Sequence, residues 1–149
     1  MDRKKRLARL LTAYAILFFG FGVYILVFES SMFDLLDALQ RTSRIGHPMD
    51  APTEPFWKFV SISLLWMLGI LCWWSRRDVT EYRNLIQLMI YAKFFSGGLL
   101  MAYFLLRGFS SPYFFGGLTD LSLGTVAAVY FLRAFPGAWR STIRFSPGR

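Results

Sequence analysis

Lys93 and Asp120 lie inside long apolar stretches of the sequence and are the residues whose types could do chemistry together. A lone charge costs about 2.5–3.5 kcal/mol at the centre of a membrane-spanning helix, so such residues tend to pair or to serve a function. A lysine–carboxylate pair could be a static lock between helices, a proton or ion site, or a polar anchor for a ligand head group. All three interpretations are compatible with the residue types.

The spacing of these residues predicts that they meet. Lys93 lies ten residues after Arg83, and Asp120 lies thirteen residues before Arg133. At the helical rise per residue, they lie about 15 Å and about 20 Å from the same boundary. The difference of about 5 Å is within the reach of a lysine side chain. A short link joins the two helices, so they must be neighbours, and we expect a buried Lys93–Asp120 ion pair.

Small residues near both charges could line a pocket around them, and the candidates are Ser96, Gly97, Gly116 and Gly124. Gly116, Asp120 and Gly124 recur every four positions, which places them on one helix face. Small residues let helices approach closely in a membrane, and the Ser96 hydroxyl adds a hydrogen-bonding group.

The remaining residues offer little for catalysis. The chain has one cysteine, Cys72, and one histidine, His47, so an internal disulfide, a structural zinc site and a bis-histidine haem are excluded. The sequence contains no nucleophile–base, metalloprotease or phosphate-loop pattern. We therefore expect no catalytic residues, no metal and no cofactor, and the chain is more consistent with a non-enzyme.

The composition predicts the elements that position these residues. The 149 residues suffice for one domain, and 55% of them are hydrophobic. Four apolar segments are long enough to cross a hydrocarbon core of about 30 Å. They are Leu10–Phe28, Phe56–Trp74, Leu85–Leu106 and Tyr113–Leu132. Backbone groups in lipid need internal partners, so these segments must be helices of a single transmembrane domain covering residues 1–149.

The basic residues predict the orientation of these spans. One side carries Arg3, Lys4, Lys5, Arg6, Arg9, Arg76, Arg77, Arg83, Arg133, Arg140, Arg144 and Arg149. The other side carries Arg41, Arg44, Lys58 and Arg107. The excess of twelve basic residues over four predicts that both termini are cytoplasmic and that residues 133–149 form a cytoplasmic tail. We expect the protein to lie in the inner (plasma) membrane of the cell. Because the net charge of +8 gathers at the ends of apolar runs, we expect no nucleic-acid partner.

The outer loop, residues 29–55, contains a predicted amphipathic helix. Its apolar positions share one face and are Met32, Phe33, Leu35, Leu36 and Leu39. Ser31, with Asp34 three residues later, is a plausible helix start. The expected fold is therefore all-α: an antiparallel four-helix membrane bundle with a short amphipathic outer helix after the first span.

The layout resembles the small four-helix bacterial membrane proteins of the DoxX-like type. The points of resemblance are the basic first helix, the longer outer loop, the tight charged link RRDVTEYR, and polar residues in the last two helices. The resemblance implies an accessory role in a respiratory or sulfur-oxidising membrane complex. The sterol-isomerase-like four-helix proteins share the outline but use several buried acids, whereas this chain offers Asp120 alone.

Three functions follow as hypotheses. The first is a non-enzymatic accessory or scaffold subunit of a membrane complex, with membrane lipids and other membrane protein subunits, or copies of itself, as partners. The second is a small transporter or a proton or ion conduit that uses Lys93 and Asp120. The third is a lipid- or quinone-binding membrane protein with a pocket around that pair.

Overall fold

The computed structural model describes residues 2–47, 56–106 and 109–137, and this part of the chain is all-helical. Its helices are α1 (Arg3–Val27), α2 (Glu29–Ser43), α3 (Phe56–Ser75), α4 (Arg83–Leu106) and α5 (Ser111–Ala134). Four of them, all except α2, are long and apolar enough to cross a membrane. The prediction of a multi-pass helical membrane protein is confirmed at this level.

The long helices extend beyond the apolar segments that predicted them. Helix α1 begins at Arg3 rather than near Leu10, because the Asp2 carboxylate accepts a hydrogen bond from the Lys4 backbone N–H at 3.1 Å. This cap satisfies one of the free N–H groups at the helix start. The basic first turns of α1 and its apolar part therefore form one continuous helix.

Helix α2 follows α1 after one residue, Phe28. Its start at Glu29 differs from the predicted start at Ser31, which lies inside the helix. The Phe28 N–H donates to the Tyr24 carbonyl at 2.8 Å, and the Phe28 carbonyl accepts from the Met32 N–H at 3.1 Å. Because Phe28 closes the last turn of α1 and opens the first turn of α2, no serine cap is needed.

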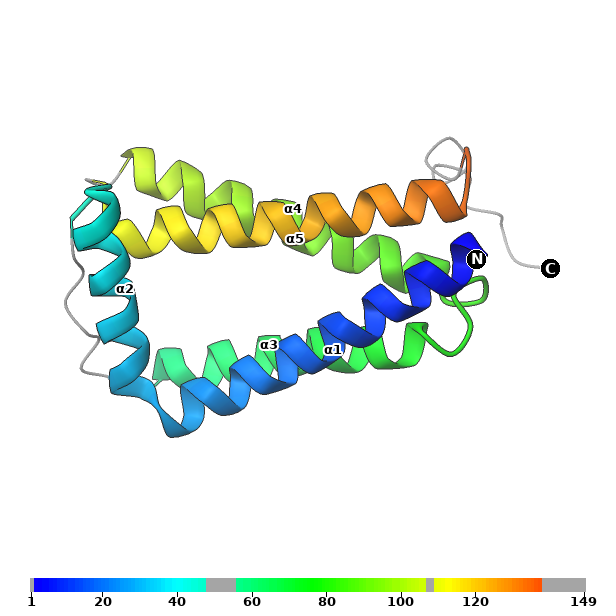
Figure 1. Cartoon of the computed structure of the whole chain (residues 1–149), viewed down its shortest axis with the longest axis horizontal. Helices are drawn as coiled ribbons and strands as arrows, with labels where there is room; N and C mark the ends of the chain where they lie inside the picture. The colour runs from blue at the N-terminus through cyan, green and yellow to red at the C-terminus, as the bar shows by residue number, and fades with distance from the viewer. Residues whose placement is uncertain (1, 48–55, 107–108, 138–149) are drawn as a thin grey trace.

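The long helices associate as two pairs. Helix α1 packs along α3, and α4 packs along α5, while α2 crosses between the pairs at the end away from the start of α1 and the end of α5 (Figure 1). Gly22 of α1 lies against the Trp66 indole of α3, and Gly69 of α3 lies against the Phe19 ring of α1. A glycine on each helix thus makes room for an aromatic ring of the other.

The two pairs pack tightly against each other in the half of the molecule that contains the start of α1 and the end of α5, called the terminal half below. The continuous buried core lies there, and its residues are Leu7, Leu11, Tyr14, Ala15, Phe18, Cys72, Val79, Ile86, Met89, Ile90, Ala127 and Phe131. The hydroxyl of Tyr14 crosses from α1 to donate to the Leu123 carbonyl of α5 at 2.7 Å. This half fixes the relative position of the pairs.

Helix α2 is tied to both pairs at the opposite end. At its start, Glu29 forms a 2.8 Å ion pair with Lys58 of α3. Beyond its end, the His47 N–H donates to the Phe109 carbonyl at 2.7 Å, and the Ser111 N–H donates to the His47 carbonyl at 2.8 Å. The helix therefore bridges the α1–α3 pair to the link between α4 and α5.

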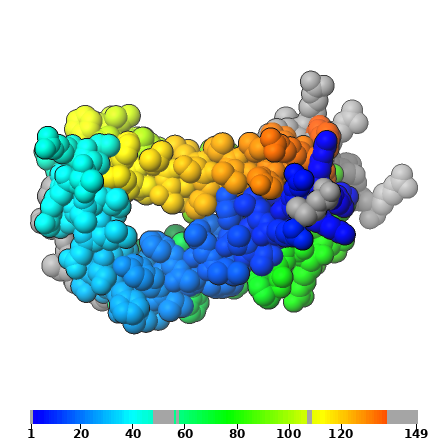
Figure 2. All heavy atoms as spheres, viewed as in Figure 1, coloured from blue at the N-terminus to red at the C-terminus, as the bar shows by residue number. Residues whose placement is uncertain are grey.

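A hollow separates the pairs beneath α2. Figure 2 shows the opening, bounded by α1, α2 and α5, in the half of the molecule opposite the terminal half. Helix α2 has no fully buried residue, and its apolar Leu35 and Leu39 are 50% and 40% exposed. The apolar face of α2 therefore lacks the packing that a closed four-helix core would give it.

Candidate functional site

The expected ion pair between α4 and α5 is present. Lys93 Nζ lies 2.6 Å from Asp120 Oδ1, and the side chains are 7% and 18% exposed. Burial strengthens the attraction between the two charges, and loss of either partner would leave an uncompensated buried charge. The carboxylate is the more accessible partner of the two.

Ser96 completes a three-residue polar cluster. Its hydroxyl donates to the second carboxylate oxygen, Asp120 Oδ2, and lies 3.3 Å from the Lys93 carbonyl oxygen. The spacing of three residues puts Ser96 and Lys93 on one face of α4, so both reach the same carboxylate. Each Asp120 oxygen thus has a donor.

The ammonium retains hydrogen-bonding capacity. Lys93 Nζ carries three N–H donors, and Asp120 Oδ1 is its acceptor among the residues that the structure describes. The ring of Phe18, on α1, lies below the ammonium at 4.9 Å from its centroid and offers a π face rather than an oxygen. The cluster can therefore donate to a further oxygen atom without losing the ion pair.

The cluster lies at the end of the packed core that faces α2. Lys93 is one turn beyond Ile90, the last core residue of α4, and Asp120 is two turns before Ala127 of α5. On α1, Phe18 is the last residue of the core cluster toward α2. The polar cluster therefore marks the α2-facing end of the packed core.

The glycines predicted as pocket lining serve mainly in helix packing. A Cβ on Gly97 would lie 2.8 Å from Leu121 Cγ, and one on Gly124 would lie 3.3 Å from Lys93 Cβ. Both are buried between α4 and α5 and do not form an open wall. Gly116 is half-buried near Leu100, and its neighbour Gly117 makes the closer approach, against Met101.

Sequence reasoning missed two members of the site. Phe18 and Tyr14 come from α1, and one supports the ammonium while the other joins α1 to α5. Their spacing of four residues places them on one helix face, but apolar and aromatic residues surround them in the sequence. Two aromatic residues four positions apart are too common in such an apolar segment to mark a site.

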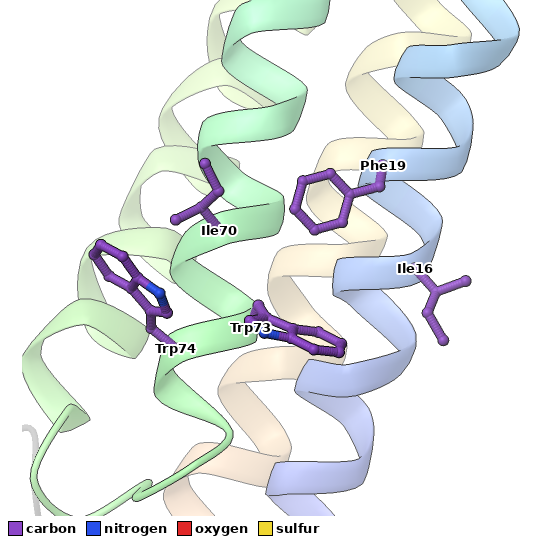
Figure 3. A pocket seen from close by; sticks show the side chains of 5 residues that line it. All are labelled: Ile16, Phe19, Ile70, Trp73 and Trp74. Carbon is purple, nitrogen blue, oxygen red and sulfur yellow. The ribbon is translucent and has the colours of Figure 1, made fainter.

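A second hollow is an apolar groove along the α1–α3 pair. Figure 3 shows Phe19 pointing from α1 toward α3 and Trp73 pointing from α3 toward α1, with Ile70 farther along α3. Its lining is completed by Ile16 and Trp74. Its lining is apolar or aromatic and carries no charge, so an acyl chain of the bilayer would suit it without any specific recognition.

Metal binding has no support in the described ranges, where no group of three histidine, cysteine or acidic side chains comes together. Comparisons of the chain with protein-family models, with curated proteins and with solved structures found no match. The class of protein therefore rests on the fold: a multi-pass helical membrane protein with a buried polar cluster.

Proposed function

We propose that the four long helices cross the cell inner membrane as an antiparallel bundle with both termini in the cytoplasm. Twelve basic residues on the side of the termini, against four on the other side, support this orientation. Helix α2 then lies at the outer surface. Arg140, Arg144 and Arg149 of the predicted cytoplasmic tail lie outside the described residues, as does residue 107 of the outer side.

We propose further that the protein binds an amphiphilic, lipid-class ligand in the hollow beneath α2. The observation that carries this proposal is the Lys93–Asp120–Ser96 cluster, which lies at the end of the packed core that faces α2 and the hollow. Ligand sites are mostly apolar hollows with a few polar groups that fix orientation. A static lock needs no hollow beside it, whereas a head-group site does.

The charge of the cluster predicts the ligand's polar group. Lys93 and Asp120 neutralise each other, so the site has no net charge with which to attract an ion. The spare N–H donors of the ammonium suit a carbonyl or hydroxyl oxygen. We therefore favour a neutral amphiphile, such as a quinone or a lipid alcohol, whose chain lies between the helix pairs.

The experiment is native mass spectrometry of protein purified in mild detergent, followed by extraction of the bound molecule. The wild type should retain a neutral amphiphile, and Asp120→Asn should lose most of it. Ser122→Ala is the matched control on the same helix, because its exposed hydroxyl bonds only the Leu118 carbonyl at 2.7 Å. A wild-type protein free of amphiphile, or equal retention by Asp120→Asn, would show the proposal to be wrong.

Ser96→Ala tests the site with the ion pair intact. This variant keeps the ion pair but removes the hydroxyl that holds Asp120 Oδ2. We expect weaker retention of the ligand, together with a loss of stability of about 1.5–3 kcal/mol, smaller than the about 3–5 kcal/mol expected for breaking the ion pair. If Ser96→Ala and Asp120→Asn both fold and both retain the ligand fully, the cluster is a lock and not an anchor.

The other two hypotheses stay predictions with their own tests. An accessory subunit, including one of the DoxX-like type, should co-purify with a larger complex at fixed stoichiometry in mild detergent. A conduit should carry flux in proteoliposomes that Asp120→Asn abolishes. The neutral charge of the Lys93–Asp120 pair favours neither of them.

A further inference from the structure

A third hollow, with two arginines in its lining, lies at the opposite end of the molecule, between the first turns of α1 and the end of α5. It is lined by Arg6, Arg9 and Leu10 of α1 and by Tyr130 of α5, and its volume is about 420 Å³. The two arginines are three residues apart and so share a helix face. Neither the ion pair nor the hollow beneath α2 involves these residues.

We propose that this hollow binds the phosphate group of an anionic membrane phospholipid. Guanidinium groups match phosphate oxygens with paired N–H donors and are less strongly hydrated than ammonium groups. The Tyr130 side chain brings a hydroxyl that can donate to a third oxygen. Arginines with a tyrosine thus offer the donors that a phosphate needs.

The local charge favours an anion. The guanidinium of Arg6 makes no ion pair with any residue in the described ranges. Asp2, one helical turn before Arg6, accepts a hydrogen bond from the Lys4 N–H. An anion entering the hollow therefore need not displace a carboxylate from Arg6.

The position of the hollow favours a lipid over a soluble phosphate. Arg9 is followed at once by Leu10, where the apolar part of α1 begins. Leu10 is half-buried and lies in the wall of the hollow, so the site joins charged head-group depth to hydrocarbon depth. A phospholipid presents the same sequence of groups, phosphate first and acyl chain next.

The test is native mass spectrometry of the detergent-purified protein titrated with phosphatidylglycerol. Phosphatidylcholine with the same acyl chains supplies a zwitterionic comparison, and inorganic phosphate supplies the anion without a chain. We expect phosphatidylglycerol to bind most tightly. Binding of inorganic phosphate at equal concentration, or equal binding of phosphatidylcholine, would overturn the proposal.

Paired variants locate the site. Arg6→Gln with Arg9→Gln should weaken phosphatidylglycerol binding by about fivefold per arginine. Arg41→Gln with Arg44→Gln is the control, because it removes the same charge at the same sequence spacing, from the last turn of α2 and the residue that follows it, and should change binding less than twofold. Tyr130→Phe should weaken binding without changing charge. Equal losses in the two arginine pairs would mean nonspecific attraction and would end the proposal.

This site is independent of the proposed ligand site beneath α2. Asp120→Asn should leave phosphatidylglycerol binding unchanged, and the Arg6–Arg9 variant should leave retention of the neutral amphiphile unchanged. The failure of either proposal therefore leaves the other open to its own test.

Discussion

Gly97 of α4 and Leu121 of α5 lie so close that a Cβ at position 97 would stand 2.8 Å from Leu121 Cγ and 3.0 Å from the Leu121 backbone nitrogen. The backbone atom cannot rotate away as a side chain can. The contact therefore sets the distance between the two helices that carry Asp120 and Lys93.

Gly97→Ala should destabilise the protein by about 1–3 kcal/mol, because the added methyl group overpacks this contact. Gly98→Ala is the control: its Cβ meets nothing within 4 Å, so alanine should be neutral or stabilise the helix by up to about 1 kcal/mol. Cys72 is 1% exposed and is the chain's one cysteine, so a thiol-reactive dye can report thermal unfolding in detergent. Equal unfolding temperatures for the two variants would contradict the close approach.

The Lys93–Asp120 pair yields a prediction about charge. Lys93→Met or Asp120→Asn leaves the other group without its partner, and losing half of a buried pair costs about 3–5 kcal/mol. The exchanged variant, Lys93→Asp with Asp120→Lys, should be more stable than either single charge change, Lys93→Asp or Asp120→Lys. The same thiol-dye measurement compares them. An exchanged variant no better than the single charge changes would show that direct pairing does not account for the stability.

The length of the apolar segments was enough to predict the long helices. An apolar segment of about 20 residues can cross a membrane as a helix, in which every backbone polar group finds a partner within the segment. The depth of Lys93 and Asp120 predicted their contact for the same reason: helical rise fixes position along each rod. These are local quantities that a single sequence carries. The orientation of the bundle in the membrane stays a prediction.

The sequence could not predict how the helix pairs meet. Whether four apolar helices pack along their whole length or only in the terminal half depends on side-chain fit between distant segments, such as Gly22 against Trp66. The start of α2 at Glu29 depended on Phe28 serving both helices. Gly117 makes a closer contact than Gly116 because of how α5 is rotated about its own axis. A four-residue repeat in the sequence does not determine that rotation.

The link between α3 and α4 predicts an acid-sensitive turn. The Asp78 carboxylate accepts from the Glu81 N–H at 3.0 Å and from the Thr80 N–H at 2.8 Å, and these bonds lower the pKa of Asp78. A carboxyl whose folded pKa lies below its unfolded value, about 3.9, adds stability above that pH. The contribution is lost as the pH falls through the folded pKa.

Asp78→Ala should therefore lower the unfolding temperature at pH 7 and flatten its decline below about pH 4. Glu81→Gln is the control, since it keeps the backbone N–H that Asp78 accepts from. Unfolding temperatures of the variants and the wild type should be measured from pH 3 to pH 7. A decline in Asp78→Ala as steep as in the wild type would assign the acid sensitivity to other groups.

Gly46 controls the attachment of α2 to the α4–α5 link. Its φ is 73°, and a Cβ there would clash with the Phe109 carbonyl oxygen and lie 3.0 Å from the Ser111 nitrogen. Both backbone hydrogen bonds of His47 run to these residues. Gly46→Ala should therefore release the end of α2 while the core of the terminal half stays folded.

Hydrogen exchange measures this release directly. In Gly46→Ala, amides of α2 should exchange faster, and those of α1 around Tyr14 should keep their protection. Gly137→Ala is the matched control, because Gly137 has a φ of 86° but open space around its Cβ, so it carries the backbone strain without the clash. Since α2 covers the hollow, Gly46→Ala should also shorten the residence of a bound amphiphile. Unchanged exchange in α2 would show that the backbone bonds of His47 do not hold the helix in place.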